Sequence, residues 1–203
     1  MRTPRGSIRF AGLLALALAL AAGCFGKTPL PDYYTLSDQS PGSVDPMASR
    51  PELGLVVGPI AIPRYLDRPE LVTRQGAHGL VPWNDHRWGG SLRTDLLDAV
   101  ARDLGAMLGT LRVAVYPGEA RFPVSYRVLI EFLALDGAPG KTVSLRAVWT
   151  VAGADGRALV VEETRLEEPV GSPAWQDLVA AQRTALRRLD GEIAARIATL
   201  PAR

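Results

Sequence analysis

Side chains suited to acid–base, nucleophilic or metal chemistry are few in this sequence and are poorly spaced for it. The chain has two histidines, His78 and His86, fewer than a typical histidine zinc site uses. A metal site built from these two and Asp85 is one interpretation, but solvated turns explain both histidines more simply. The acidic pairs at residues 162–163 and 167–168 fit a solvated strand edge better than paired acid–base catalysis.

Sequence motifs of the common enzyme classes are missing as well. The sequence has no Gly-x-Ser-x-Gly nucleophile elbow, no phosphate-binding loop and no dinucleotide-binding glycine pattern after a strand. We therefore predict a protein that is not an enzyme, with no catalytic residue, no metal and no cofactor.

Cys24 is the only cysteine, and it follows a typical targeting segment. Three arginines precede an apolar run at residues 10–22, which is short for a membrane span of about 20 residues. A lone secreted cysteine is a free thiol, a partner for another chain, or a lipid carrier. The small residues at 21–23 resemble a lipobox, although Ala21 stands where leucine is usual. We predict that residues 1–23 are a signal peptide and that Cys24 is lipidated. A plain signal peptide and an uncleaved helical anchor are the alternatives.

Phe25 follows the cysteine and bears on which membrane holds the protein. In lipoproteins of Gram-negative cells, an aspartate at this position tends to retain the protein at the inner membrane. Because Phe25 replaces it, we predict an outer-membrane lipoprotein whose domain faces the periplasm.

Charge and cysteine content limit the class of protein further. The full chain has a net charge of +2, and removing three arginines with the signal peptide leaves the mature chain near −1. No strongly basic surface remains, which argues against nucleic acid as a partner. A single cysteine cannot form an internal disulfide. The domain must therefore be held together by its own core, for which 47% hydrophobic residues and about 180 mature residues suffice.

Residues 24–52 are predicted to form a proline-rich tether, followed by a single domain at residues 53–203. Five prolines in the tether remove backbone donors and favour extended chain. Two adjacent tyrosines, Tyr33 and Tyr34, interrupt it. We expect this short segment to pack on the domain as an edge strand, with an exposed loop as the alternative.

Two segments have the spacing of amphipathic helices. At residues 88–108, apolar residues recur every three or four positions with charged residues between them, which predicts one buried face. Ser91 or Thr94 is the candidate N-cap. A second helix is predicted to begin at Ser172 and Pro173, as cap and first helical residue, and to continue to residue 200.

Several β-rich segments surround these helices. They lie at residues 53–62 with a bend at 58–59, and at 70–74, 80–81, 111–116, 126–132, 142–151 and 159–165. Asp155 and Gly156 mark a hairpin turn, and the short connections imply antiparallel pairing. We therefore predict an α+β fold, an antiparallel β-sheet with two amphipathic helices packed on one face, in the order strands, helix, strands, helix.

Trp83 and Trp88 flank a polar stretch before the first predicted helix. One interpretation is that both cover the core at a loop-to-helix junction. The other is a contact with a partner or with lipid, because exposed tryptophans are common interface anchors.

Three segments resemble a known family. Residues 61–74 read Ala-Ile-Pro-Arg-Tyr-Leu-Asp-Arg-Pro-Glu-Leu-Val-Thr-Arg and resemble the central signature of the ABC-type transport auxiliary lipoproteins, which include the paraquat-inducible lipoproteins. Residues 33–36 and 86–88 are similar to two further segments of that family. The family usually continues Trp-Ala-Glu-Pro-Leu after this point, whereas residues 88–92 here read Trp-Gly-Gly-Ser-Leu. Any partner contact made by that glutamate is missing.

This resemblance implies a membrane-anchored subunit of an envelope lipid-transport system. Its partners would be an MCE-domain protein that forms a conduit across the periplasm and inner-membrane permease components, and a homo-oligomer is a natural geometry on a ring-shaped conduit. A carrier of lipid or another apolar ligand and a structural envelope lipoprotein are the alternatives. The interface candidates are Tyr65, Leu66, Asp67, Arg68, Arg87 and Trp88. Closure of the turn by Asp67 and Arg68 is the competing explanation for those two.

Overall fold

A computed structural model describes residues 30–37 and 49–201. The predicted signal peptide and Cys24 lie outside these residues. Residues 31–203 form a unit of their own. No helix within the described ranges is both long enough and apolar enough to cross a membrane.

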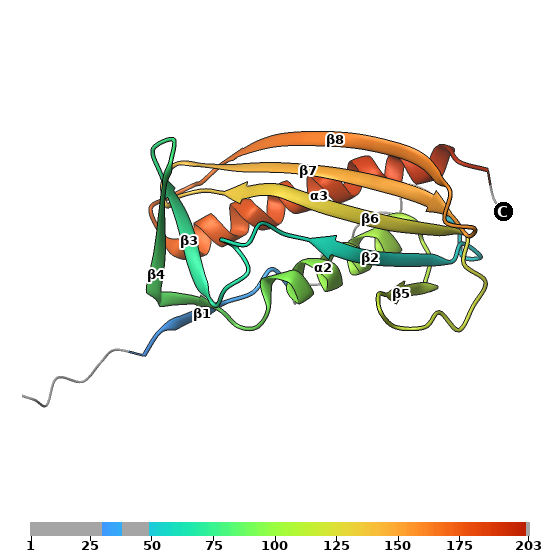
Figure 1. Ribbon diagram of the computed structural model, residues 1–203, viewed down its shortest axis with the longest axis horizontal. Coiled ribbons are helices and arrows are strands. Elements are labelled where there is room, and N and C mark those ends of the chain that lie inside the picture. The colour runs from blue at the N-terminus through green and yellow to red at the C-terminus, as the bar shows by residue number, and fades with distance from the viewer. Residues whose placement is uncertain (1–29, 38–48, 202–203) are drawn as a thin grey trace, which may run out of the picture. The chain divides into compact units, whose positions relative to one another are not determined.

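A five-stranded sheet is the main layer of this unit (Figure 1). Its strand order is β5-β2-β6-β7-β8, with β2 at Leu55–Ala61, β5 at Val113–Val115, β6 at Tyr126–Asp136, β7 at Thr142–Gly153 and β8 at Ala158–Pro169. β6, β7 and β8 pair antiparallel, but β2 runs parallel to both β5 and β6. The expectation of a purely antiparallel sheet was therefore wrong. A helix lies between β2 and β5, and such a crossover makes parallel pairing possible.

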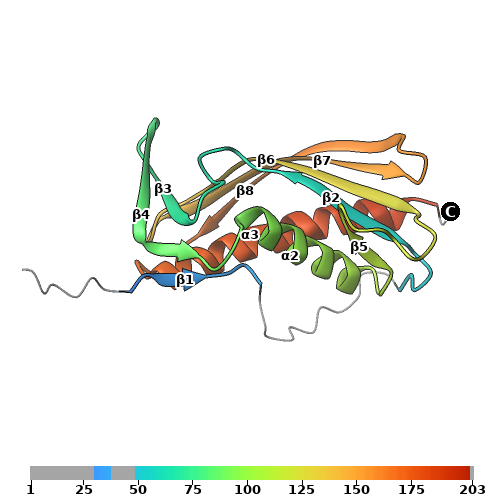
Figure 2. The ribbon, with the colours of Figure 1, turned by 60° about the horizontal axis from the view of Figure 1, so that its bottom comes forward.

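A separate three-stranded sheet stands beside the first (Figure 2). It contains β1 at Asp32–Tyr34, β3 at Glu70–Gln75 and β4 at Gly79–Trp88, in the order β1-β4-β3. β1 pairs parallel with the end of β4, which confirms the expected edge strand. β4 is much longer than expected, because the polar stretch between the two tryptophans continues the strand.

Two helices cover one face of the five-stranded sheet, as predicted (Figure 2). Helix α2 spans Leu92–Met107, and the side chain of Ser91 accepts a hydrogen bond from the backbone amide of Thr94 as its N-cap. Helix α3 spans Trp175–Thr199 and has Ala174 at its N-cap. The helix therefore begins later than expected, and Ser172 caps the chain before it by accepting from the Ala174 amide.

The core fills the space between the sheet and the helices. Its largest fully buried side chains include Trp149, Tyr126 and Phe132 from the sheet and Leu96 and Leu104 from α2. The indole of Trp149 donates to the Thr164 hydroxyl at 3.0 Å, so its only polar atom is satisfied.

The predicted bend in β2 falls at Gly58, whose φ of +104° is accessible mainly to glycine. A side chain there would lie 3.0 Å from Leu97 and from Tyr116. The register of β2 against β6 shifts between Val57 and Ile60. The bend thus lets the strand change direction above α2.

Candidate functional site

The signature turn, defined here as residues 63–69, is closed by its own backbone. The Leu66 amide donates to the Pro63 carbonyl at 2.9 Å, and the Arg68 amide donates to the Leu66 carbonyl at 2.9 Å. The side chain of Leu66 is 5% exposed and belongs to the core. No side-chain atom of Asp67 or Arg68 takes part in these two backbone bonds.

The structure brings this turn beside the end of β4, about twenty residues later in the chain. The Trp88 amide donates to the Pro69 carbonyl at 2.8 Å, and the Trp88 side chain is 6% exposed. Together they form an open groove of about 410 Å³, the signature groove, lined by residues 67–69 and 88–92. Asp67, Arg68 and Trp88 line it, whereas Tyr65, Leu66 and Arg87 do not.

Tyr65 lies behind the groove as an anchor between the two sheets. Its hydroxyl donates to one oxygen of Asp136 at 2.8 Å, and Arg74 donates to the other at 2.8 Å through Nε. Burial, followed by the hydrogen bond and negative charge of Asp136, raises the pKa of Tyr65 to about 12. The tyrosine is thus a neutral donor that ties the turn to the end of β6.

Asp67 and Arg68 are the charged side chains that line the signature groove. Asp67 pairs with Arg93 of α2 at 2.8 Å, and Arg68 pairs with Glu70 at 2.8 Å. The hydrogen bond from Arg68 lowers the pKa of Glu70. Because both side chains of the turn are more than two-fifths exposed, they remain accessible to a partner. Arg87 is half-buried, and its Nε donates to the Asn84 carbonyl at 2.9 Å.

A latch on α2 holds the segment that follows β1. The carboxylate of Asp95 accepts from the Thr35 hydroxyl at 2.9 Å, the Leu36 amide at 2.5 Å and the Ser37 hydroxyl at 2.8 Å. Leu36 is 1% exposed. Asp95 is one of the charged residues between the apolar positions of the helix predicted at residues 88–108, so a solvated side chain was expected there. The segment that it binds lies 59 residues earlier in the chain.

A buried polar cluster joins α2 to α3 and was not foreseen. Arg183 forms a bidentate ion pair with Asp103, in which its two terminal nitrogens donate to the two carboxylate oxygens at 2.6 and 2.7 Å. Asp190 is fully buried nearby, and within the described part of the chain neither of its oxygens has a hydrogen-bond partner. Burial and then the negative charge of Asp103 raise the pKa of Asp190. Asp190 falls on the apolar stripe of α3, four residues after Leu186. This position was the one sign in the sequence that Asp190 is buried.

An aromatic cluster joins β1, β4 and the start of α3. Trp83 meets Trp175 edge to face with centroids 5.1 Å apart, and His86 stacks on Trp175 at 4.2 Å. The Tyr34 hydroxyl lies 3.1 Å from Nδ1 of His86. Placing His86 in a solvated turn was therefore wrong, because strand β4 carries it into this cluster, whereas His78 is exposed in a turn. No group of three or more metal-binding side chains occurs among the described residues.

The family model described as ABC-type transport auxiliary lipoprotein component matches residues 34–194. The chain belongs to this family. It is a family of transport components and not of enzymes, which agrees with the lack of catalytic motifs in the sequence. The signature turn, the five-stranded sheet and strands β3 and β4 of this auxiliary lipoprotein lie within the matched region, which begins at the last residue of β1.

Solved structures share the fold of this auxiliary lipoprotein. A crystal structure of an uncharacterised protein aligns with a TM-score of 0.67 and 18% identity, over 83% of this chain and 99% of that chain. A protein from Xanthomonas campestris aligns with a TM-score of 0.61 and 17% identity, over 83% of this chain and 92% of that one. At this identity the likeness shows the fold only. No curated protein matches the sequence.

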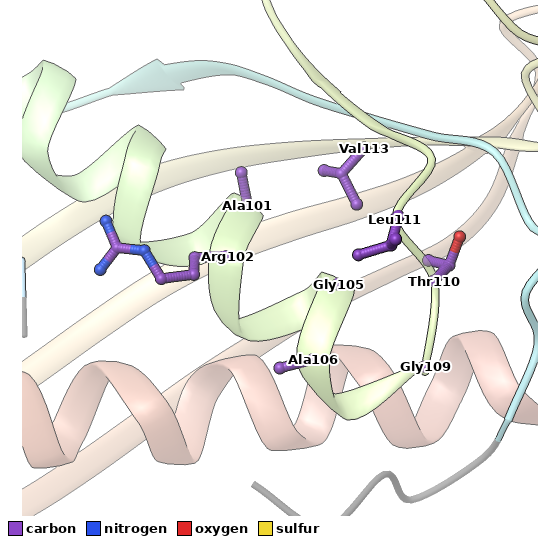
Figure 3. A pocket seen from close by; sticks show the side chains of 8 residues that line it. All are labelled: Ala101, Arg102, Gly105, Ala106, Gly109, Thr110, Leu111 and Val113. Carbon is purple, nitrogen blue, oxygen red and sulfur yellow. The ribbon is translucent and has the colours of Figure 1, made fainter. Parts of the chain in front are cut away.

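A second open groove of the auxiliary lipoprotein lies between the end of α2 and the chain before β5. Its volume is about 560 Å³, and small or apolar residues dominate its lining. Figure 3 shows Leu111 and Val113 lying opposite Ala101 and Gly105. Leu111 is fully exposed. This groove contains none of the interface candidates.

Proposed function

We propose that this auxiliary lipoprotein is a non-enzymatic subunit of an envelope lipid-transport system, anchored through lipid on Cys24 in the outer membrane and facing the periplasm. It docks an MCE-domain conduit protein there, and inner-membrane permease components act at the other end of the conduit. The observation that carries this proposal is the signature groove. Charged side chains from the segment that resembles the family signature are exposed there, on a rigid base.

The rigidity of that base favours protein docking over chemistry. Leu66 and Trp88 are buried, and Tyr65 is fixed by Asp136. A pre-organised surface loses little conformational entropy on binding. Exposed Asp67 and Arg68 present opposite charges that select a complementary partner surface. Lipid anchoring adds to this by raising the effective concentration of the domain at its membrane.

Co-purification tests the proposal. The tagged full-length chain is purified from its own membranes in mild detergent, and the proteins that accompany it are identified by mass spectrometry. We expect an MCE-domain protein with the wild type and at least a ten-fold loss of it with Arg68→Glu. The control is Arg157→Glu, which makes the same charge change in the exposed β7–β8 turn. Wild type without an MCE-domain protein contradicts the function, and full recovery with Arg68→Glu contradicts the site.

A lipid carrier is the second candidate, and the open apolar groove beside β5 favours it. Volumes of about 300–1,000 Å³ are typical of small-molecule sites. Stoichiometric lipid in the same preparation, with no protein partner, supports the carrier. The mass of the purified particle also gives its number of copies, and a ring of copies matches a ring-shaped conduit.

A further inference from the structure

A pocket of about 580 Å³, which we call the α3 pocket, lies between the segment after β1 and helix α3. Figure 2 shows β1 beside the first turns of this helix. The segment contributes residues 35–37, which the Asp95 latch holds in place. Helix α3 contributes positions 176, 179, 180, 183, 184 and 187, which a spacing of three or four places on one face. None of these residues lines the signature groove.

Arg187 differs from the other arginines of α3, because it has no carboxylate partner within the described part of the chain. Arg183, Arg188 and Arg196 each have a carboxylate oxygen within 3.0 Å. Arg187 is half-buried, yet it makes no hydrogen bond or ion pair with a described residue. Removing a charged group from water without a partner costs free energy. An anion bound in the pocket offsets that cost.

The acidic groups nearby leave this positive charge uncompensated. Asp103 is already occupied by its bidentate ion pair. Burial raises the pKa of Asp190 well above its usual value, which favours its neutral form, and its oxygens accept from no described residue. Asp95 and Arg102 oppose each other across Ser37, whose hydroxyl lies 2.8 Å from the carboxylate and 3.5 Å from the guanidinium.

Apolar surface lies next to the charge in the same pocket. Leu36 and Val179 are 1% and 7% exposed, and the small side chain of Ala180 leaves space above them. A guanidinium binds phosphate through two parallel N–H···O bonds. The volume falls within the range of about 300–1,000 Å³ that is typical of small-molecule sites. The lining therefore fits an oxyanion that carries a short apolar chain.

We propose that the α3 pocket binds a phosphate group through Arg187. A lipid headgroup and free phosphate share this chemistry, and the apolar lining favours the lipid, whose chain packs against Leu36 and Val179. The choice of phosphate over carboxylate rests on the proposed function, because anionic membrane lipids carry phosphate. The anion site itself rests only on the unpaired charge of Arg187 and on the shape of the pocket.

Isothermal titration calorimetry tests this site. The full chain, purified from its own membranes in neutral detergent, is titrated with hexyl phosphate, inorganic phosphate and hexanol, each against a detergent blank. We expect saturable binding of hexyl phosphate, about ten-fold or more weaker in Arg187→Gln, which loses a charged hydrogen-bond donor. Ala180→Phe fills the pocket without changing its charge and should weaken binding as well. The control is Arg188→Gln, which makes the same charge change one residue away, outside the pocket.

The three ligands separate the possible occupants. Hexyl phosphate that binds more tightly than inorganic phosphate supports a lipid phosphate, and equal affinities support free phosphate. Hexanol that binds as tightly as hexyl phosphate overturns the phosphate site, and so does the absence of saturable binding. Equal losses in Arg187→Gln and Arg188→Gln also overturn it. Circular dichroism confirms that each variant is folded. Failure here leaves the proposed function intact, because co-purification of an MCE-domain protein tests that function separately.

Discussion

Replacing the buried Asp190 with asparagine should change how the stability of the domain depends on pH. Asp190 is fully buried beside the Asp103–Arg183 pair. Burial and the charge of Asp103 raise its pKa, while Arg183 and Arg187 oppose that shift. The folded domain therefore keeps a proton on Asp190 at pH values where the unfolded chain has released it. Asparagine has a similar shape and no proton to release.

The size of the effect follows from proton linkage. For a carboxyl group whose folded pKa is raised, the stabilising contribution is complete below the unfolded pKa, near 4, and is lost as the pH rises through the folded pKa. Between these two values the folded state binds one more proton. The free energy of unfolding then falls by about 1.4 kcal/mol per pH unit from this group. The Asp190→Asn variant lacks this slope. Its free energy of unfolding, relative to that of the wild type, should therefore rise with pH.

Urea unfolding measures this difference directly. Unfolding is followed by tryptophan fluorescence at pH 5, 6 and 7 for wild type and Asp190→Asn, because Trp149 is fully buried. Subtracting the two free energies cancels groups that titrate alike in both proteins. The control is Asp98→Asn on the exposed face of α2, for which we expect a constant difference. A constant difference for Asp190→Asn would refute the assignment of a retained proton.

Three further substitutions test the packing and the site. Tyr65→Phe removes the hydrogen bond to Asp136 and should lower the free energy of unfolding in urea by about 1–2 kcal/mol; no change would mean that Arg74 is sufficient to hold that carboxylate. Asp95→Ala removes the acceptor for Thr35, Leu36 and Ser37. Amide exchange at residues 34–37 should then accelerate about ten-fold or more, and exchange as slow as in Asp98→Ala would contradict the latch. Leu104→Ala empties a fully buried position and should cost about 3–5 kcal/mol of unfolding free energy; a loss below about 1 kcal/mol would show that the core collapses into the space.

Local patterns predicted the helices and most of the strands. The spacing of apolar residues at 92–107 and 175–199 is set by contacts within one helix face, so a single sequence reveals it. The turn at Gly156 was also predictable, because it depends on neighbouring residues in the sequence. The structure gives this glycine a φ of +81°. The parallel pairing of β2 was not predictable from connection lengths, because it depends on how α2 crosses the sheet.

The candidate site was predicted in outline and not in its contacts. The signature turn and the end of β4 were both identified, and the structure places them in one groove. Which of their side chains are exposed depends on packing between segments distant in sequence: Leu66 and Trp88 turn into the core, whereas Asp67 and Arg68 remain outside. The Asp95 latch and the buried Asp190 were missed because a charged residue on a helix is usually solvated. Only the position of Asp190 on an apolar stripe indicated otherwise.

The parallel pairing of β1 with β4 also determines how the domain carries mechanical load. With the proposed anchor at Cys24, a pull from the membrane would reach the fold first at β1, which pairs with β4 through residues 32–34 and 86–88. Tension along the strand axis acts across all these hydrogen bonds at once, so they must shear together. The Asp95 latch lies directly behind them and passes the remaining force to α2. Resistance to detachment under tension is then governed by the rate at which this short strand opens.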